Sequence, residues 1–444
     1  MASSYSSSGA AAADDAAATA PPPARRSREF DVVILGASGF TGRYVVREAL
    51  KALSAPPRRS APSPSRGAPL QARRRAPMGL VLVPFPSPSI PLVPADASDP
   101  ASLLALARRA RLVLSCVGPF RLYGAPSPPP APRPAPTTST SPASPSLREL
   151  GIGRRIVGNL GTYESAVLGV ANVEKLQELR RSRPRKPRPV MQTIHLLDAI
   201  VNLIDFVNNL TFPAYSWPPP PKGPLIEHQK TIGLWAIKLP SADSVVVRRT
   251  LATLTENPQG LPGVNESEDF AEKRKQFWSS VKPAHFGVKI GSKSILGVLR
   301  FIFTGLFIGL LGKYSFGRKI LLKFPEIFSL GWFRKTGPTE EEVRSATFKM
   351  WFIGKGYSNQ SVASQPGSKL DTEIITRVSG PEIGYLTTPI ILIQCALIVL
   401  GQRENLPKGG VYTPGIVFGP TDLQQRLQEN GITFDVISTK TDQN

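Results

Sequence analysis

The chain has few of the residues that build disulfide frameworks and metal centres. Its 444 residues contain only 2 cysteines and 3 histidines. Cys116 and Cys395 lie in apolar segments far apart in the sequence, so we expect neither a disulfide framework nor a metal site, and a reducing compartment is favoured. His195, His228 and His285 show no ligand spacing to one another or to a cysteine, and we expect structural or solvated roles for them.

Acidic residues are also scarce, and the formal net charge is +22. A charge of that size is typical of proteins that bind nucleic acid or anionic lipid. Much of the excess is arginine within Pro/Ser/Ala-rich stretches, at residues 58–75 and 180–188. These stretches lack the interleaved aromatic residues that stack on bases, so we expect no nucleic-acid partner.

The N-terminus lacks the apolar core of a secretory signal. Residues 1–29 are rich in Ala, Ser and Pro, which favours a disordered tail. A transit peptide for an organelle such as the mitochondrion is the alternative. Its arginines cluster late, however, and Asp14 and Asp15 interrupt it.

A glycine-rich turn between an apolar strand and a helix is the most informative motif. Residues 30–35 (FDVVIL) predict a buried parallel strand, and residues 43–50 (RYVVREAL) predict an amphipathic helix. Between them, Gly36 suits a tight turn, Gly39 a close approach to a pyrophosphate, and Gly42 close packing of helix on sheet. The amide groups and the dipole at a helix start hold phosphates. We therefore predict an α/β fold with a Rossmann-type dinucleotide-binding domain over residues 30–124, whose cofactor contacts come from Gly36, Ala37, Ser38, Gly39, Phe40, Thr41 and Gly42.

A second strand fits the same domain. Residues 96–100 (DASDP) predict a helix start, and residues 112–117 (LVLSCV) predict a buried strand that ends at Gly118 and Pro119. Cofactors of doubly wound sheets bind at the carboxyl ends of the strands. Gly118 and Pro119 are therefore further candidate cofactor neighbours, with a plain loop as the alternative.

Together these motifs resemble the saccharopine dehydrogenase-like oxidoreductases, most closely their plant members. The matching segments are DVVILGASGFTGRYVVREAL, DASDPASL, LVLSCVGPFRLYG, IVGNLGTYESAVLGVAN and most of the chain from KTIGLWAIKLPSAD onward. The resemblance implies an NADP-binding Rossmann domain and an α+β substrate domain, here residues 151–444. It also implies kinship with a lipid-acting enoyl reductase of mycobacteria, a role in lipid or glycolipid metabolism, and association with lipid droplets or membranes. The choice of NADP over NAD follows from the resemblance alone.

Three segments depart from the family pattern: residues 60–90, 125–150 and 190–220. The first two are Pro/Ser/Arg-rich, a composition that buries too little apolar surface to offset chain entropy. Disordered insertions are one interpretation. If both segments are encoded by GC-rich codons, a reading frame shifted by two bases can spell peptides typical of the family, so our hypothesis is out-of-frame translation. We interpret residues 190–220 as retained intron sequence, with an ordinary amphipathic insertion as the alternative. The second strand of the sheet would then be missing, and we expect this chain to bind NADP weakly or not at all.

The C-terminal half again has the patterns of folded protein. Val245–Val247 predicts a strand, and residues 345–358 alternate like another, with Ala346, Phe348, Met350 and Phe352 on one face. Glu373–Val378 predicts a neighbouring strand. Ile390–Leu400 is an apolar run of helical length that is too short to span a bilayer.

Residues 294–333 are the main membrane candidate. Residues 294–311 (SILGVLRFIFTGLFIGLL) approach spanning length, but Arg300 lies inside them. Basic residues follow, and a second apolar stretch, residues 320–333, is broken by Pro325 and Glu326. We predict an interfacial or hairpin-like contact whose basic flanks face anionic headgroups. A buried pair of core helices is the alternative.

Two functions follow from these patterns. The first is an oxidoreductase that transfers hydride between NADP (or NAD) and a hydrophobic, lipid-like substrate. In the polar cluster GTYES, Tyr163 or Glu164 could do acid–base work, and a structural role is the alternative for each. The second is a non-catalytic protein that docks on lipid droplets or membranes through residues 294–333, which is the outcome expected if this copy is inactive.

Overall fold

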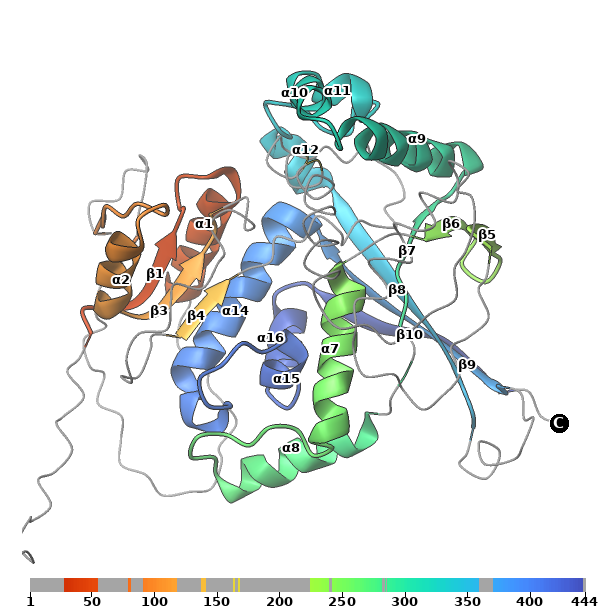
Figure 1. Ribbon diagram of the computed structural model, residues 1–444. Helices are drawn as coiled ribbons and strands as arrows, with labels where there is room; N and C mark the ends of the chain where they lie inside the picture. Colours follow the sequence, from red (N-terminus) through yellow and green to blue (C-terminus); the bar gives the residue numbers. More distant parts are fainter. Residues whose placement is uncertain are drawn as a thin grey trace, which may run out of the picture.

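The computed structural model describes residues 28–54, 79–80, 91–117, 137–140, 163, 167, 224–238, 242–281, 284, 286–358 and 370–441. These residues form a mixed α/β structure with one parallel and two antiparallel sheets (Figure 1). The parallel sheet has the order β2-β1-β3-β4. Its strands are β1 (Phe30–Leu35), β2 (Gly79–Leu80), β3 (Ala110–Ser115) and β4 (Thr137–Thr140).

The predicted strand, turn and helix at residues 30–50 are confirmed. All but one of the residues of β1 are buried, as a central parallel strand requires. The strand leads through the glycine turn into α1 (Phe40–Ser54). The predicted helix start at residues 96–100 is also confirmed, because α2 (Pro100–Arg109) begins with Pro100 at its first position. The Asp99 side chain accepts hydrogen bonds from the amides of Ala101 and Ser102.

Two strands of the parallel sheet lie in segments where the sequence predicted no ordered element. β2 pairs Gly79 with Val33 on β1, and β4 pairs along four residues of β3. The prediction that β1 lacks a neighbour on this side is therefore wrong, although β2 is only two residues long. Both strands fall in short stretches without proline, whose amides remain able to pair. The reading-frame hypothesis stays a prediction.

Helices cover both faces of the parallel sheet. On one face, Leu106 of α2 packs with Phe30, Val33 and Val113. On the other face, the sheet packs against α1 and also against a helix from the C-terminal half, α14 (Thr388–Gly401). The buried residues of α14 that belong to this core are Leu392, Ile393, Ala396, Ile398 and Val399, so the two halves of the chain share it.

The helix that contains α14 is longer than the sequence predicted. A π-helical turn, η1 (Ile383–Thr387), runs directly into α14, so residues 383–401 form one helical stretch of 19 residues. Within the described part of the chain, this is the one helix long and apolar enough to cross a membrane, and the expectation that it is too short is wrong. Its apolar window is 61% buried, and Figure 1 shows α14 between the parallel sheet and the long strands β8–β10. The burial identifies it as a core helix.

The C-terminal half contains the two antiparallel sheets. The predicted strands at residues 345–358 and 373–378 are confirmed as β8 (Thr347–Gly356) and β9 (Thr372–Pro381), which pair with each other. β10 (Thr433–Thr441) completes the order β10-β9-β8. The predicted shared face is buried only in part, because Phe348 is in the core whereas Phe352 is exposed. The smaller sheet has the order β5-β6-β7 and consists of β5 (Ile226–Gln229), β6 (Leu234–Lys238) and β7 (Lys289–Ser292).

The strand predicted at Val245–Val247 is wrong, because these residues lie in α7 (Ala242–Glu256). Branched residues favour strands only weakly, and packing overrides that preference. Leu251 and Leu254 on the same helix are buried, Leu254 against Trp278 and Ile416. The remaining helices are α8 (Glu268–Ser280), α12 (Glu340–Ser345), η2 (Arg403–Asn405), α15 (Pro414–Phe418) and α16 (Leu423–Glu429).

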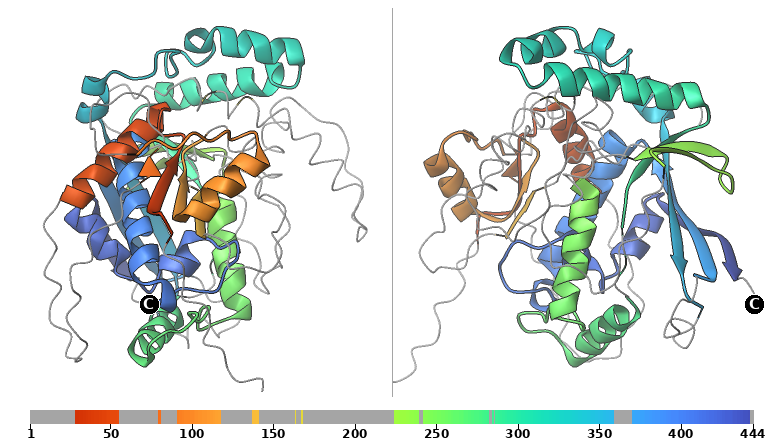
Figure 2. Two further views of the ribbon diagram at one scale, coloured as in Figure 1. Left: turned by 90° about the vertical axis from the view of Figure 1, so that its left-hand side faces the viewer. Right: turned by 45° about the vertical axis from the view of Figure 1, so that its right-hand side comes forward.

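The predicted membrane candidate forms a layer of helices at one end of the molecule (Figure 2). It consists of α9 (Ile295–Leu311), α10 (Ser315–Lys323) and α11 (Pro325–Phe328), and we call it the α9–α11 layer. The break predicted at Pro325 is confirmed, since α10 ends before it and α11 begins with it. On its inner side the layer packs around Tyr163, Leu321 and Phe333.

Candidate functional site

The glycine turn that joins β1 to α1 is held by close backbone contacts. Gly36 has φ +79°, a conformation that side chains with a Cβ rarely adopt. A Cβ on Gly42 would lie 2.1 Å from the carbonyl oxygen of Gly36, so only glycine fits there. A Cβ on Gly39, in contrast, would meet only that same oxygen, at 3.2 Å. Two glycines therefore shape the turn, whereas a side chain on the third would have one close neighbour among the described residues, the Gly36 carbonyl oxygen.

The start of α1 is suited to an anion. The amide of Gly39 donates to Gly36 O at 3.0 Å, which closes the turn just before the helix begins at Phe40. The first amides of a helix have no partners within the helix and carry partial positive charge. No acidic side chain occupies the first turn of α1. This helix start can therefore bind a phosphate group through its backbone.

The end of β3 lies beside this turn. The amide of Cys116 donates to Leu35 O at 2.8 Å, and a Cβ on Gly36 would contact Val117 at 2.8 Å. The structure thus brings the ends of the two predicted strands together at one edge of the sheet. Ala37 is fully buried at this edge. The candidates Gly118 and Pro119 lie outside the described residues.

An aromatic cluster beside the start of α1 was not predicted from the sequence. The rings of Phe40 and Tyr385 have centroids 4.8 Å apart, and Tyr44 lies 5.7 Å from each of them. Tyr385 is on the π-helical turn η1, whose first amides are capped by the buried carboxylate of Glu382. Such turns are rare and frequently occur at functional sites. The local signals in the sequence were Pro381, which ends the strand, and Glu382, whose side chain can accept from the amides that follow.

A hollow of about 160 Å³ adjoins this cluster, between α1, α12 and η1. Its charged side chains are paired with one another: Glu340 accepts from Arg47 at 2.9 Å and from Arg344 at 2.8 Å. Arg47 is the main cause of the lowered pKa of Glu340. Burial is the main cause of the raised pKa of Tyr44, and the nearby Glu340 adds to it. The charged side chains that line the hollow thus form an ionic contact between the two halves of the chain.

Three titratable side chains, Tyr163, Cys116 and Cys395, are poorly suited to acid–base or thiol chemistry. Tyr163 is fully buried, its hydroxyl has no hydrogen-bond partner, and burial raises its pKa to about 12. It packs on Phe333, with ring centroids 5.0 Å apart. Burial also raises the pKa of Cys116 and of Cys395 to about 12, so neither is a thiolate at neutral pH. The acid–base role considered for Tyr163 is not supported, and Glu164 lies outside the described residues.

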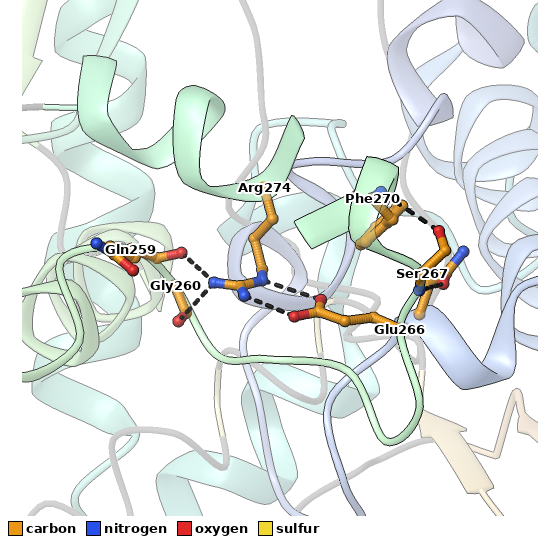
Figure 3. Close-up of polar contacts among 7 residues, drawn as sticks. Gln259, Gly260, Glu266, Ser267, Phe270 and Arg274 are labelled. Carbon is orange, nitrogen blue, oxygen red and sulfur yellow. Dashed lines mark hydrogen bonds and ion pairs between the residues drawn. The ribbon is translucent and has the colours of Figure 1, made fainter. Parts of the chain in front are cut away.

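A buried ion pair holds the loop before α8 (Figure 3). The Arg274 guanidinium donates to both carboxylate oxygens of Glu266, at 3.1 and 2.6 Å, and to the carbonyls of Gln259 and Gly260. The Arg274 side chain is 8% exposed and that of Glu266 12%. Arg274 is the main cause of the lowered pKa of Glu266. Arg274 on α8 and Glu266 in the loop pair with each other, and the other Arg274 donor bonds go to loop carbonyls. This cluster is therefore a structural clamp.

Fold and site together define a mixed α/β protein with a glycine-rich turn at the carboxyl edge of a parallel sheet. Comparison with known proteins then gives the family. The chain is 52% identical over 467 residues to a probable mitochondrial saccharopine dehydrogenase-like oxidoreductase of Arabidopsis thaliana, which covers 92% of this chain and 96% of that protein. It is 31% identical to the human saccharopine dehydrogenase-like oxidoreductase, over 94% of this chain and 99% of that protein. The chain therefore belongs to the saccharopine dehydrogenase-like oxidoreductase family.

A further relative is named for its location in the cell. The lipid droplet localized protein of Caenorhabditis elegans is 27% identical over 92% of this chain and 98% of its own length. No protein-family model and no solved structure matches the chain. The alignment with the Arabidopsis relative spans 467 positions but includes only 92% of the 444 residues of this chain. Some segments of that relative therefore have no counterpart here.

Proposed function

We propose that the protein is an NAD(P)-dependent oxidoreductase whose parallel sheet is a Rossmann-type dinucleotide-binding domain. One observation carries this proposal: Gly36 and Gly42 form a turn that excludes side chains, directly at the positive end of α1. Gly39, which has no side chain at the start of this helix, is where the backbone would approach a pyrophosphate. This arrangement fits a dinucleotide through backbone contacts alone.

The bound cofactor would supply hydride, and the protein's own residues would position it. The turn from Gly36 to Gly42 would hold the phosphates, and Cys116 and Val117 at the end of β3 would flank them. In hydride transfer between a nicotinamide and a substrate, the protein contributes mainly orientation and exclusion of water. This role requires no activated acid, base or thiolate, and Tyr163, Cys116 and Cys395 are none of these.

We propose a hydrophobic, lipid-like substrate, acted on at a membrane or lipid-droplet surface. The name of the Caenorhabditis elegans relative supports a lipid-droplet location, and the name of the Arabidopsis relative supports a mitochondrial one. The apolar cluster around Tyr163 and Phe333, beneath the α9–α11 layer, is in keeping with a substrate of low polarity. A lipid or glycolipid pathway is part of the same proposal.

A titration with NADPH and with NADH tests the cofactor. We expect saturable, weak binding by the wild-type chain, because β2 offers only two residues beside β1. Gly39→Val should abolish it, since the side chain would fill the phosphate space while leaving the turn intact. Gly409→Val is a matched control, because a Cβ on Gly409 meets nothing within 4 Å and its backbone, like that of Gly39, does not have the positive φ that would strain valine.

The second candidate function is a non-catalytic protein that docks on membranes, and the exposed apolar α9–α11 layer favours it. The same titration separates the two. A folded wild-type chain that shows no saturable change in NADPH or NADH fluorescence would support the non-catalytic alternative. Binding that Gly39→Val removes would support the oxidoreductase.

A further inference from the structure

The α9–α11 layer presents an apolar surface that no described residue covers. Leu296, Leu299, Phe303 and Leu310 fall within about 60° of one another around α9 at 100° per residue. All four are exposed, Leu296 by 73% and Phe303 by 51%. The opposite side of the helix carries its buried residues, Val298 among them. A core helix would bury such a stripe.

The apolar surface continues over the rest of the layer. Phe316 on α10 is 75% exposed and Ile327 on α11 is 64% exposed. Tyr314, Phe324 and Leu330 are exposed as well. Single exposed apolar residues are ordinary, but so many on three helices that contact one another mark a docking surface. Figure 2 shows that α9, α10 and α11 lie together across one end of the molecule in both views.

The charges of this segment favour one kind of partner. Residues 293–335 contain eight basic side chains and a single acidic one, Glu326. Arg334 is paired with Glu342 outside the layer and Arg300 donates to a backbone carbonyl, so the other six carry the positive charge of the surface. Lys319 and Lys323 follow Phe316 at i+3 and i+7, so they share its exposed face. Glu326 already accepts a hydrogen bond from the amide of Lys335 at 3.1 Å. A surface that is both apolar and basic complements a lipid leaflet with anionic headgroups better than an acidic protein or a second copy of this chain.

Arg300, the one charged residue within α9, does not obstruct this surface. Its guanidinium donates to the carbonyl of Leu330 and lies over the Trp332 ring, 5.2 Å from the ring centre. The charge is thus held between α9 and the segment after α11. Contact of the apolar stripe with acyl chains would therefore leave the guanidinium bound to a carbonyl and a ring of the protein, and not alone among the acyl chains.

We propose that the α9–α11 layer is a docking surface for one leaflet of a membrane that contains anionic phospholipids. α9 lies flat in the interface, with Leu296, Phe303 and Phe316 among the acyl chains and the lysines at the headgroups. With 17 residues, α9 is shorter than the roughly 20 needed to span a bilayer. This inference deepens the proposed function by naming its partner surface, but it does not depend on cofactor binding.

Co-sedimentation with vesicles tests the proposal on the full chain. The wild type should bind phosphatidylcholine vesicles that contain phosphatidylserine more tightly than vesicles without it, and added salt should weaken the binding. The double variant Leu296→Glu/Phe303→Glu should reduce the partition coefficient by about tenfold or more, because each side chain loses the free energy of burial among acyl chains. Lys319→Gln/Lys323→Gln should remove the preference for phosphatidylserine.

The control variant is Val411→Glu, which replaces an equally exposed apolar residue, 73% exposed, outside the layer. It should bind vesicles as the wild type does. Circular dichroism and NADPH titration on every variant keep loss of docking distinct from misfolding and from failure of the proposed cofactor site. Equal binding by the wild type and the Leu296→Glu/Phe303→Glu variant would overturn the proposal. The proposal would also be overturned if the wild type were a dimer that does not bind vesicles and the Leu296→Glu/Phe303→Glu variant were a monomer.

Discussion

At the scale of single residues, the glycine turn makes opposite predictions for two neighbouring glycines. Gly42→Ala should destabilise the protein by about 2 kcal/mol or more, because its Cβ would meet the Gly36 carbonyl and force the backbone to shift. Gly39→Ala should cost less than about 1 kcal/mol, because one oxygen is its only close contact. Urea unfolding followed by circular dichroism measures both. Equal losses for the two variants would contradict the assigned roles.

Tyr163 gives a second prediction at this scale. Its buried hydroxyl has no partner, so Tyr163→Phe should stabilise the protein by about 1 kcal/mol while the ring keeps its contact with Phe333. Thermal unfolding should show a higher midpoint. Because the phenol stays protonated up to a pKa of about 12, the variant should also leave the pH profile of any NAD(P)H oxidation unchanged. A lower midpoint, or a shifted profile, would show that the hydroxyl has a partner or a chemical role.

At the scale of elements, the clamp before α8 predicts a dependence of stability on pH. Glu266 has a lowered pKa in the folded protein, chiefly through Arg274, so its contribution to stability is complete above the usual pKa of a glutamate. The contribution is lost as the pH falls through the lowered value. Glu266→Gln should therefore destabilise the protein at neutral pH by about 3 kcal/mol, since it leaves Arg274 buried without its counter-charge.

The measurement for this prediction is the unfolding midpoint of both proteins across the acidic range. The gap between wild type and Glu266→Gln should be widest near neutral pH and should shrink as the pH falls. A gap that stays constant down to strongly acidic pH would mean that the Glu266 charge contributes nothing. Arg344→Gln is a suitable control, because its ion pair with Glu340 is exposed and should add little to stability.

At the scale of the whole molecule, local patterns predicted local structure well. The apolar strand, the glycine turn and the amphipathic helix depend on neighbouring residues, and Asp99 caps the helix that it directly precedes. The strands β8 and β9 follow their alternation, whereas Val245–Val247 became a helix because packing outweighed branching. Short-range sequence signals therefore determined the secondary structure of most of these segments, and tertiary packing determined that of Val245–Val247.

The arrangement of distant segments could not be predicted in the same way. α14 covers the parallel sheet from the other half of the chain, and Arg47 meets Glu340 across 293 residues of sequence. The cluster of Phe40, Tyr44 and Tyr385 exists only because η1 packs against α1. Such contacts depend on tertiary packing, and no periodicity within either segment encodes them. The sequence therefore predicted the glycine turn of the candidate site, but it did not predict that Tyr385 on η1 would pack beside the start of α1.

The most direct test of the central claim is hydrogen–deuterium exchange with and without NADPH. The account predicts slower exchange for amides in the peptide that covers residues 36–43, because their N–H groups would bind the phosphates. Amides of β10, at the far edge of the other sheet, should exchange at the same rate in both conditions. Unchanged exchange at residues 36–43, at an NADPH concentration that saturates binding, would contradict the claim that the glycine turn holds the cofactor.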